Sequence, residues 1–182
     1  MEVIQAKSAG FCFGVDRAVR MAYELAEREP RSRMLGAVIH NSHVVAELEA
    51  AGMRVISAPE EAESGDWVLL RAHGVGLAAY ETLRGRGARI VDATCPKVAR
   101  VQQIVSQAER EGRQPLMIGD PEHPEVRGVA GWCRRLLVCS GPEAVERWLE
   151  SDADATNLPL TVVSQTTMIR ASWETSLKIL KK

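Results

Sequence analysis

The sequence predicts an α/β protein built on parallel sheets. Short apolar stretches of strand length alternate with amphipathic stretches of helical spacing along all 182 residues. Several predicted helices close at a glycine, such as Gly52 and Gly112, just before the next strand begins. Cysteine and histidine motifs follow the strands directly, at the edge where open α/β sheets bind ligands. This order is typical of strand–helix–strand units with right-handed crossovers.

Each element follows from its own local pattern. The stretch from Val3 to Ala6 has strand character, and apolar residues recur at helical spacing from Val15 to Ala26. Beyond them the predicted strands are Met34–Ile39, Arg54–Ser57, Trp67–Leu70, Arg89–Val91, Leu116–Ile118, Leu136–Val138 and Leu160–Val163. The remaining predicted helices are Val44–Ala51, Leu77–Arg84, Val98–Glu111, Val126–Trp132, Pro142–Leu149 and Ser172–Leu180. The acidic segment Pro59–Gly65 is expected to form a solvated surface.

Composition limits the classes of function. The hydrophobic fraction of 46% can fill one large or two small cores. A net charge of −1 without a basic stripe argues against nucleic-acid and membrane-surface partners. No apolar run approaches the roughly 20 residues of a membrane span, and the sequence starts without the pattern of a signal peptide. We therefore expect a soluble, cytoplasmic protein.

Cys12 stands between the first predicted strand and the first predicted helix. Gly10 and Gly14 flank it, so the backbone can turn tightly and approach a group bound to the sulfur. Unpaired N–H groups and the positive end of the helix dipole favour an anionic sulfur at this position. The alternative is a small buried core cysteine.

Three of the four histidines, His40, His73 and His123, lie just past the ends of predicted strands. Cys95 and the pair Gln165-Thr166 hold equivalent positions. Histidines with threonine and glutamine donors at strand ends suit a phosphate or diphosphate. The alternative for each histidine is a loop residue with a satisfied hydrogen bond; His43, at the start of a helix, falls outside the pattern.

Other sites are not supported. The chain has no G-x-G-x-x-G after the first strand and no Walker lysine motif, which argues against nicotinamide and ATP sites. It also has no C-x-x-C pair, so dispersed Cys12 and Cys95 fit an iron–sulfur cluster better than a zinc finger. Cys133 and Cys139 lie among large apolar residues and are expected to be core thiols. Glu125, two residues after His123, is a candidate general acid, with an ordinary surface glutamate as the alternative.

Six motifs in order resemble the LytB family of 4-hydroxy-3-methylbut-2-enyl diphosphate reductases. They are Gly10-Phe11-Cys12-Phe13-Gly14-Val15, Ile39-His40-Asn41, Ala72-His73-Gly74-Val75, Asp92-Ala93-Thr94-Cys95-Pro96, His123-Pro124-Glu125-Val126 and Ser164-Gln165-Thr166-Thr167. The resemblance runs from the first residue to the last. It implies an oxidoreductase of non-mevalonate isoprenoid biosynthesis, which reductively removes an allylic hydroxyl to give isopentenyl and dimethylallyl diphosphates.

The resemblance also implies roles for the motif residues. Cys12 and Cys95 would be two of three ligands of a [4Fe–4S] cluster whose third cysteine is not in this chain. His40, His73 and His123 would hold the diphosphate, with Gln165 beside them, while Thr166 would orient the substrate and Glu125 would deliver protons. Ferredoxin or flavodoxin would donate the electrons.

Family members have three similar α/β domains in a trefoil-like arrangement, and the resemblance covers only two of them. We expect residues 1–13 to pack with the third domain, residues 14–95 to form one αβα domain and residues 96–182 to form a second. The main interpretation is a fragment of a longer reductase, whether an excised piece or the product of a truncated gene, ahead of a naturally split enzyme. The alternative function is a clusterless diphosphate-binding module without catalysis.

Overall fold

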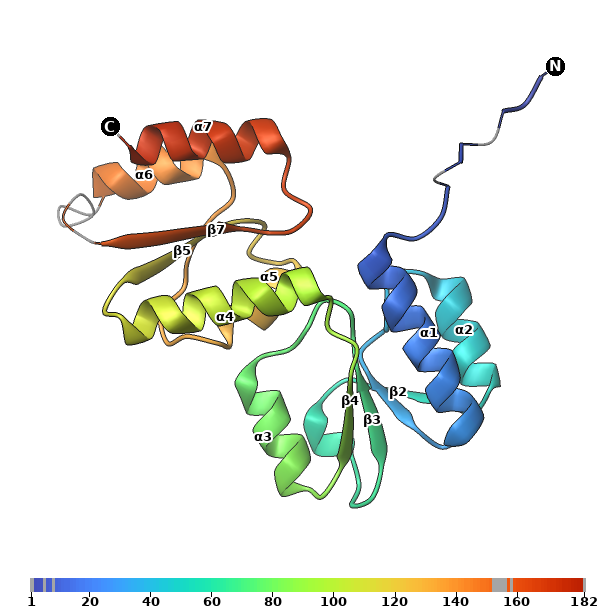
Figure 1. Ribbon diagram of the computed structural model, residues 1–182. Helices are drawn as coiled ribbons and strands as arrows, with labels where there is room; N and C mark the ends of the chain where they lie inside the picture. Colours follow the sequence, from blue (N-terminus) through green and yellow to red (C-terminus); the bar gives the residue numbers. More distant parts are fainter. Residues whose placement is uncertain (1, 5, 8, 152–156, 158, 182) are drawn as a thin grey trace.

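A computed structural model of the chain describes residues 2–4, 6–7, 9–151, 157 and 159–181. These residues form two parallel sheets, as the sequence predicted, with helices on both faces of each (Figure 1). The strands of the first sheet are β1 (Arg33–Leu35), β2 (Arg54–Ile56), β3 (Trp67–Leu70) and β4 (Arg89–Asp92). Their order across the sheet is β2-β1-β3-β4.

Each face of the first sheet has its own apolar core. Helices α1 (Phe13–Arg28) and α2 (Ser42–Ala50) cover one face, where Ala18, Ala22, Met34 and Leu48 are fully buried. Helix α3 (Leu77–Gly85) and a 3₁₀ turn, η1 (Pro59–Glu61), cover the other. Because both faces are buried, the central strand β3 is apolar along almost its whole length, as expected for a parallel sheet.

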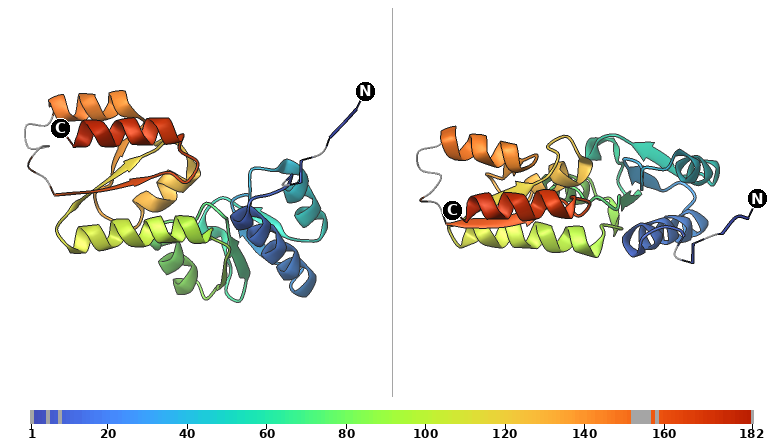
Figure 2. Two further views of the ribbon diagram at one scale, coloured as in Figure 1. Left: turned by 45° about the horizontal axis from the view of Figure 1, so that its top comes forward. Right: turned by 90° about the horizontal axis from the view of Figure 1, so that it is seen from above.

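The second sheet repeats the arrangement with three strands. Its order is β6-β5-β7, from β5 (Gln114–Ile118), β6 (Leu137–Cys139) and β7 (Leu160–Ser164). Helices α4 (Pro96–Arg110) and α5 (Pro124–Ala130) pack on one face, and α6 (Pro142–Ser151) and α7 (Arg170–Leu180) on the other. Figures 1 and 2 show the two three-layer units side by side, with the N-terminal end of α4 at their junction.

The predicted strand from Val3 to Ala6 is wrong for the residues of that stretch that the structure describes. They form no strand, and Val3 and Ile4 are 84% and 85% exposed. The segment runs away from the body of the molecule (Figure 1). A strand needs a neighbouring strand to pair its N–H and C=O groups, and none of the described strands lies beside this segment. Strand propensity without a partner therefore does not produce a strand.

Most other boundaries agree to within two residues, with one clear exception. The strand predicted over Met34–Ile39 ends at Leu35, because Gly36 adopts a φ of +71°. The remaining apolar residues, Val38 and Ile39, are buried in the loop that follows. None of the helices in the described part of the chain is long and apolar enough to cross a membrane.

Candidate functional site

Three loops from the two sheets converge on one point. His40 lies in the loop after β1 and His73 in the loop after β3, and these strands are neighbours in the first sheet. His123 lies in the loop after β5, the central strand of the second sheet, and is the N-cap residue of α5. The carboxyl ends of strands in both sheets therefore contribute to the same site, as the placement of the motifs predicted.

The three imidazole rings form a compact cluster. The ring centroids of His40 and His73 are 4.6 Å apart, those of His73 and His123 are 5.5 Å apart, and those of His40 and His123 are 6.2 Å apart. One ring nitrogen from each residue lies within 4.8 Å of the others, close enough to share a ligand. His40 is exposed and the other two are half-buried, so the histidine cluster (His40, His73, His123) opens to solvent on one side.

The neighbours of His73 control its charge. Burial, followed by the positive charges of His40, His123 and Arg71, lowers the pKa of His73 from 6.5 to about 4. His73 is therefore neutral at pH 7 when no anion is present. A bound anion would offset these causes and favour its protonated form.

Close backbone contacts at glycines hold helix α5 against the loop that carries His73, and so bring His73 and His123 together. Gly128 on α5 lies against the loop that carries His73, and a Cβ at Gly128 would come within 2.9 Å of the carbonyl oxygen of Gly74 and 3.3 Å of that of His73. A similar contact joins Gly76 and Gly131, where a Cβ on Gly131 would approach the Gly76 Cα to 2.5 Å. Only glycine allows α5 to lie this close to the loop.

Glu125 is not a surface glutamate, because only 1% of it is exposed. Its two carboxylate oxygens accept hydrogen bonds of 2.7 Å from the backbone N–H and the hydroxyl of Thr166. Its own backbone N–H donates to Nδ1 of His123, at 3.1 Å. Thr166 is exposed, so its hydroxyl connects a buried carboxylate to the surface. One chain of contacts thus links the histidine cluster, the acid and the loop after β7.

Gln165 shapes the loops beside this carboxylate. Its side-chain oxygen accepts a 3.0 Å hydrogen bond from the backbone N–H of Asp120, and its amide nitrogen donates to the hydroxyl of Thr167 at 2.7 Å. Gln165 is 7% exposed. Both polar ends of its amide therefore have partners within the protein, in the loops after β5 and β7.

Cys12 and Cys95 are both N-cap residues, of α1 and α4. A Cβ built on Gly14 would lie 2.4 Å from Sγ of Cys95, so the first turn of α1, directly after Cys12, is in contact with Cys95. Arg17 of α1 donates hydrogen bonds to the backbone carbonyls of Thr94, at 3.2 Å, and Asp92, at 3.5 Å. The sequence analysis missed this role of Arg17, since no local signal predicts a contact across 77 positions.

The other two cysteines pack with the apolar cores of the second sheet. Cys139 is 2% exposed in the core of the second sheet, and burial raises the pKa of its thiol. Burial and the charge of Glu109 raise the pKa of Cys133 to about 11. Both stay protonated at neutral pH. The remaining histidine, His43, is exposed and faces Glu47 on the next turn of α2, at 3.2 Å.

A sequence model of the family described as "LytB protein" matches residues 3–182. The chain belongs to the LytB family. Its LytB relatives include the 4-hydroxy-3-methylbut-2-enyl diphosphate reductases of Caldanaerobacter subterraneus, 42% identical, and Geobacter sulfurreducens, 39% identical. Each alignment covers 100% of this chain, and 62% and 61% of the relatives. The chain thus spans about three fifths of the length of these LytB proteins.

Solved structures agree with the family assignment. A structure titled as (E)-4-hydroxy-3-methyl-but-2-enyl diphosphate reductase, the terminal enzyme of the non-mevalonate pathway, superposes with a TM-score of 0.81 at 34% identity. It covers 98% of this chain and 63% of that one. The Plasmodium falciparum reductase gives a TM-score of 0.87 at 26% identity, over 96% of this chain and 54% of its own. The LytB chain described here shares their fold.

Proposed function

We propose that this chain provides the diphosphate-binding and proton-donating part of a 4-hydroxy-3-methylbut-2-enyl diphosphate reductase. One observation carries the proposal. Three imidazoles that can share a ligand lie beside a buried carboxyl group that is hydrogen-bonded to the hydroxyl of an exposed threonine. The first feature suits the diphosphate of the substrate. The second suits an allylic hydroxyl that must be protonated as it leaves.

The histidine cluster binds the diphosphate in this proposal. A neutral imidazole offers one N–H donor, and an imidazolium offers two. A diphosphate arriving at the cluster stabilises the protonated rings, so binding is accompanied by proton uptake and by charge-assisted hydrogen bonds. We expect diphosphate binding to raise the pKa of His73, because the pKa of its ring is lowered to about 4 in the free protein.

Glu125 and Thr166 deliver the proton. In the structure the Thr166 hydroxyl donates its one proton to a Glu125 oxygen, so toward the substrate its oxygen can only accept. For the relay Glu125 is protonated and this hydrogen bond is reversed: the carboxyl group donates to the Thr166 oxygen, and the Thr166 hydroxyl donates to the substrate. A proton passes from Glu125 to the Thr166 oxygen as the Thr166 proton moves to the leaving hydroxyl. The carboxylate ends ionised and the threonine is unchanged. The backbone N–H of Thr166, at 2.7 Å, then stabilises the carboxylate.

Cys12 and Cys95 fit two ligands of an iron–sulfur cluster. Each stands at the N-terminus of a helix, the first turn of the helix after Cys12 is in contact with Cys95, and neither thiol is buried. Cys133 packs half-buried against the apolar core on one face of the second sheet and Cys139 is buried in the core on the other, so we assign neither as the third ligand. When bound, a [4Fe–4S] cluster supplies single electrons and a Lewis-acidic iron for the substrate hydroxyl. We infer that the third thiolate comes from the part of LytB proteins that these 182 residues do not match.

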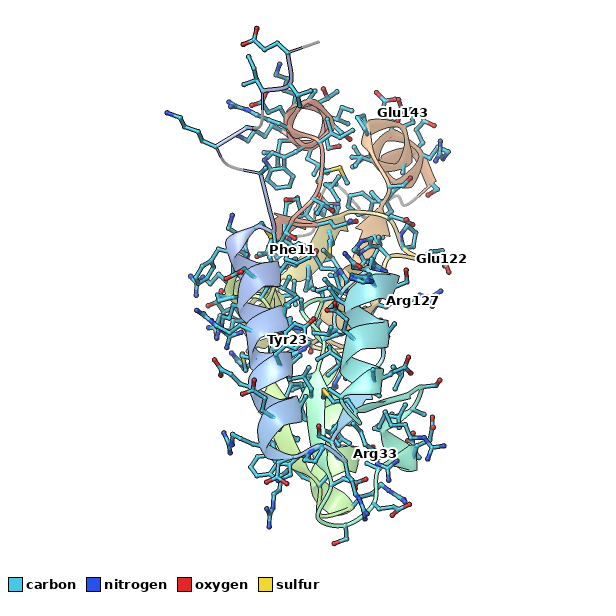
Figure 3. The ribbon with its side chains drawn as sticks, turned by 90° about the vertical axis from the view of Figure 1, so that its right-hand side faces the viewer. Phe11, Tyr23, Arg33, Glu122, Arg127 and Glu143 are labelled. Atoms are coloured by element: carbon cyan, nitrogen blue, oxygen red, sulfur yellow. The ribbon has the colours of Figure 1, made fainter. Side chains whose placement is uncertain are left out.

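The same reasoning gives a domain organisation. We propose that residues 14–95 and 96–182 are two domains, each built on one sheet. Residues 1–13 then dock on a third. Val3, Ile4 and Phe13 are 84%, 85% and 72% exposed and have no cover within the described chain, so a further domain would bury apolar surface there. Phe11 projects at the same end of α1 (Figure 3).

We propose ferredoxin or flavodoxin as the electron donor, because the cluster chemistry takes electrons singly. We also propose a cytoplasmic location, supported by the free thiols of Cys12 and Cys95, because thiols persist in reducing compartments. A clusterless diphosphate-binding module is the second candidate. It is favoured by one observation: the described candidate site carries two thiols, Cys12 and Cys95, and a cubane cluster normally needs more ligands.

Pyrophosphate binding to this chain, measured by calorimetry with a chelator present to exclude metal ions, tests the diphosphate site. Replacing His40 or His123 with Ala removes a hydrogen bond to a charged group, worth roughly 1.5–3 kcal/mol, which lowers the affinity by roughly 10–150-fold. The matched control is His43→Ala, an exposed histidine outside the cluster. Equal affinities for all three variants would exclude the cluster as the diphosphate site.

A further inference from the structure

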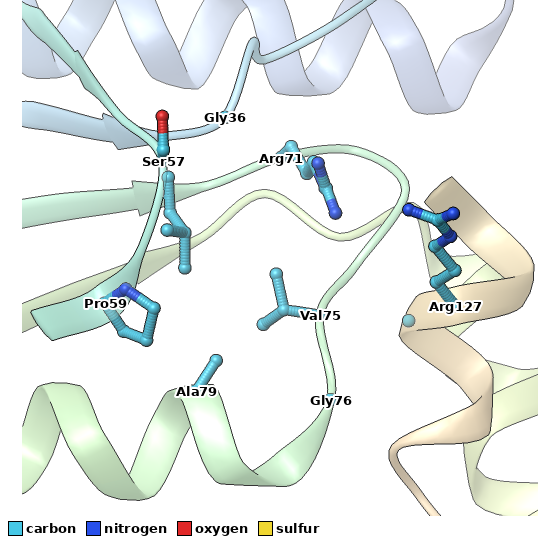
Figure 4. Close-up of a pocket in the computed structure, with 10 residues that line it drawn as sticks. Gly36, Ser57, Pro59, Arg71, Val75, Gly76, Ala79 and Arg127 are labelled. Carbon is cyan, nitrogen blue, oxygen red and sulfur yellow. The ribbon is translucent and has the colours of Figure 1, made fainter. Parts of the chain in front are cut away.

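A second site for an anion lies next to the first sheet, outside the histidine cluster. A cavity of about 230 Å³ opens between the loop after β1, the end of β2, helix α3 and helix α5 (Figure 4). This is far more than the roughly 10–15 Å³ that one water requires. Arg71 and Arg127 reach into one end of it, and Leu35, Pro59, Val75 and Ala79 form its apolar part. None of the three clustered histidines lines it.

Arg71 is a cation without a counterion. Its Nε is buried and has no hydrogen-bond partner, and the guanidinium forms no ion pair with any residue that the structure describes. No carboxylate lines the cavity. Burial and the nearby positive charge of Arg127 both lower the pKa of Arg71. Two guanidinium groups that repel each other beside a cavity are costly unless an anion joins them.

The backbone leaves room for this arrangement. Gly36 adopts a φ of +71°, and a Cβ there would come within 2.9 Å of Nη1 of Arg71. The guanidinium therefore packs against bare backbone at the cavity wall. Arg127 is held from its outer side by an ion pair with Glu122, which does not line the cavity (Figure 3). Its guanidinium faces Arg71 across the cavity in Figure 4.

We propose that this cavity binds a small organic phosphate, with the phosphate between Arg71 and Arg127 and a short aliphatic part over Leu35, Val75 and Ala79. Planar guanidinium groups donate paired N–H groups that match phosphate oxygens. The buried Nε of Arg71 supplies a donor that the protein leaves unused. The apolar wall distinguishes an organic phosphate from the free ion. This site goes beyond the proposed reductase function and does not depend on it.

The test titrates the 182-residue chain with n-butyl phosphate, in a His123→Ala background that weakens the histidine cluster. We expect one saturable site whose affinity falls at least tenfold on Arg71→Met. Arg127→Met lowers it as well, and its exposed side chain makes this variant safe for folding. Arg170→Met, on the exposed surface of α7, is the matched control and leaves the affinity unchanged.

If the folded Arg71→Met and Arg127→Met proteins bind n-butyl phosphate as tightly as their parent, the proposal of this site is wrong. If Arg71→Met does not fold, the Arg127→Met result decides alone. Inorganic phosphate is titrated in parallel, and we expect it to bind several-fold more weakly than butyl phosphate, because it leaves the apolar wall uncovered. Equal affinities would overturn the assignment to an organic phosphate. Failure here leaves the pyrophosphate result at the histidine cluster unaffected, so the two proposals fail separately.

Discussion

At Glu125 the fold joins residues that are 41 positions apart in the chain. The sequence suggested Glu125 as an acid because it follows His123, and suggested Thr166 because it follows a strand. It contained no signal that the two would share both carboxylate hydrogen bonds, since such a pairing depends on β5 and β7 being neighbours in one sheet. The sequence was enough to predict which residue types lie at strand ends. Which of these residues contact each other could be seen only in the folded structure.

Replacing Glu125 with Gln separates proton delivery from binding. The amide oxygen can still accept from the Thr166 N–H, and the Thr166 hydroxyl can turn to accept from the amide, so the shape is kept. The transferable proton is lost. We expect kcat to fall by roughly 10²–10⁴ with nearly unchanged substrate affinity.

The measurement is anaerobic turnover by a protein in which these 182 residues are joined to the remaining part of a LytB relative. Glu122→Gln, an exposed glutamate on the same loop, is the control. Normal turnover by Glu125→Gln would mean that the proton comes from elsewhere.

His73 should make the stability of the chain depend on pH. Its pKa is about 4 in the folded protein, against 6.5 for an unperturbed histidine, so the unfolded chain binds a proton first as pH falls. The contribution is intact above pH 6.5 and is lost progressively between pH 6.5 and 4, at no more than about 1.4 kcal/mol for each pH unit. Denaturant unfolding of wild type and His73→Gln in phosphate-free buffer checks this. Parallel curves for the two proteins would contradict it.

At the scale of elements, the repeated strand–loop–helix pattern predicted nearly every helix and strand. It failed at the described residues of the stretch 3–6, where the local pattern is extended but the described chain offers no partner strand.

The pattern also could not predict that Gly128 and Gly131 place α5 against the loop carrying His73. A glycine inside a helix usually weakens it. Here the absence of a side chain sets the distance between two histidines.

Gly128→Ala tests that placement. The new methyl group would meet backbone atoms of Gly74 and His73 at 2.9–3.3 Å, and backbone cannot give way as a flexible side chain can. We expect a loss of stability of roughly 1–3 kcal/mol and weaker pyrophosphate binding, because α5 carries His123 away from His73.

Gly85→Ala is the control. No atom lies within 4 Å of the position that a Cβ at residue 85 would take. The Gly85→Ala protein should therefore be as stable as the wild type, or more stable by up to about 1 kcal/mol. A Gly128→Ala protein with wild-type affinity for pyrophosphate would show that the close approach does not set the histidine spacing.

At the scale of the whole molecule, the two sheets place their ligand-binding edges on one shared site. The histidine cluster takes two members from the first sheet and one from the second, and Cys95 lies against Gly14 in the first turn of the helix that follows Cys12. The fold class and the placement of these residues at strand ends were predictable, because the parallel strands of one sheet all end at one edge. The Arg71 cavity was not, since it depends on how α5 packs against the loop after β3.

The central claim is that these residues supply the histidines, the acid and two thiolates of a reductase that needs a third part. Anaerobic conversion of 4-hydroxy-3-methylbut-2-enyl diphosphate tests it most directly, by comparing this chain alone with the same residues joined to the remaining part of the Caldanaerobacter relative, each after cluster reconstitution. We expect isopentenyl and dimethylallyl diphosphates from the joined protein and none from the chain alone. A joined protein that holds its cluster and binds pyrophosphate, yet forms neither product, would contradict the account.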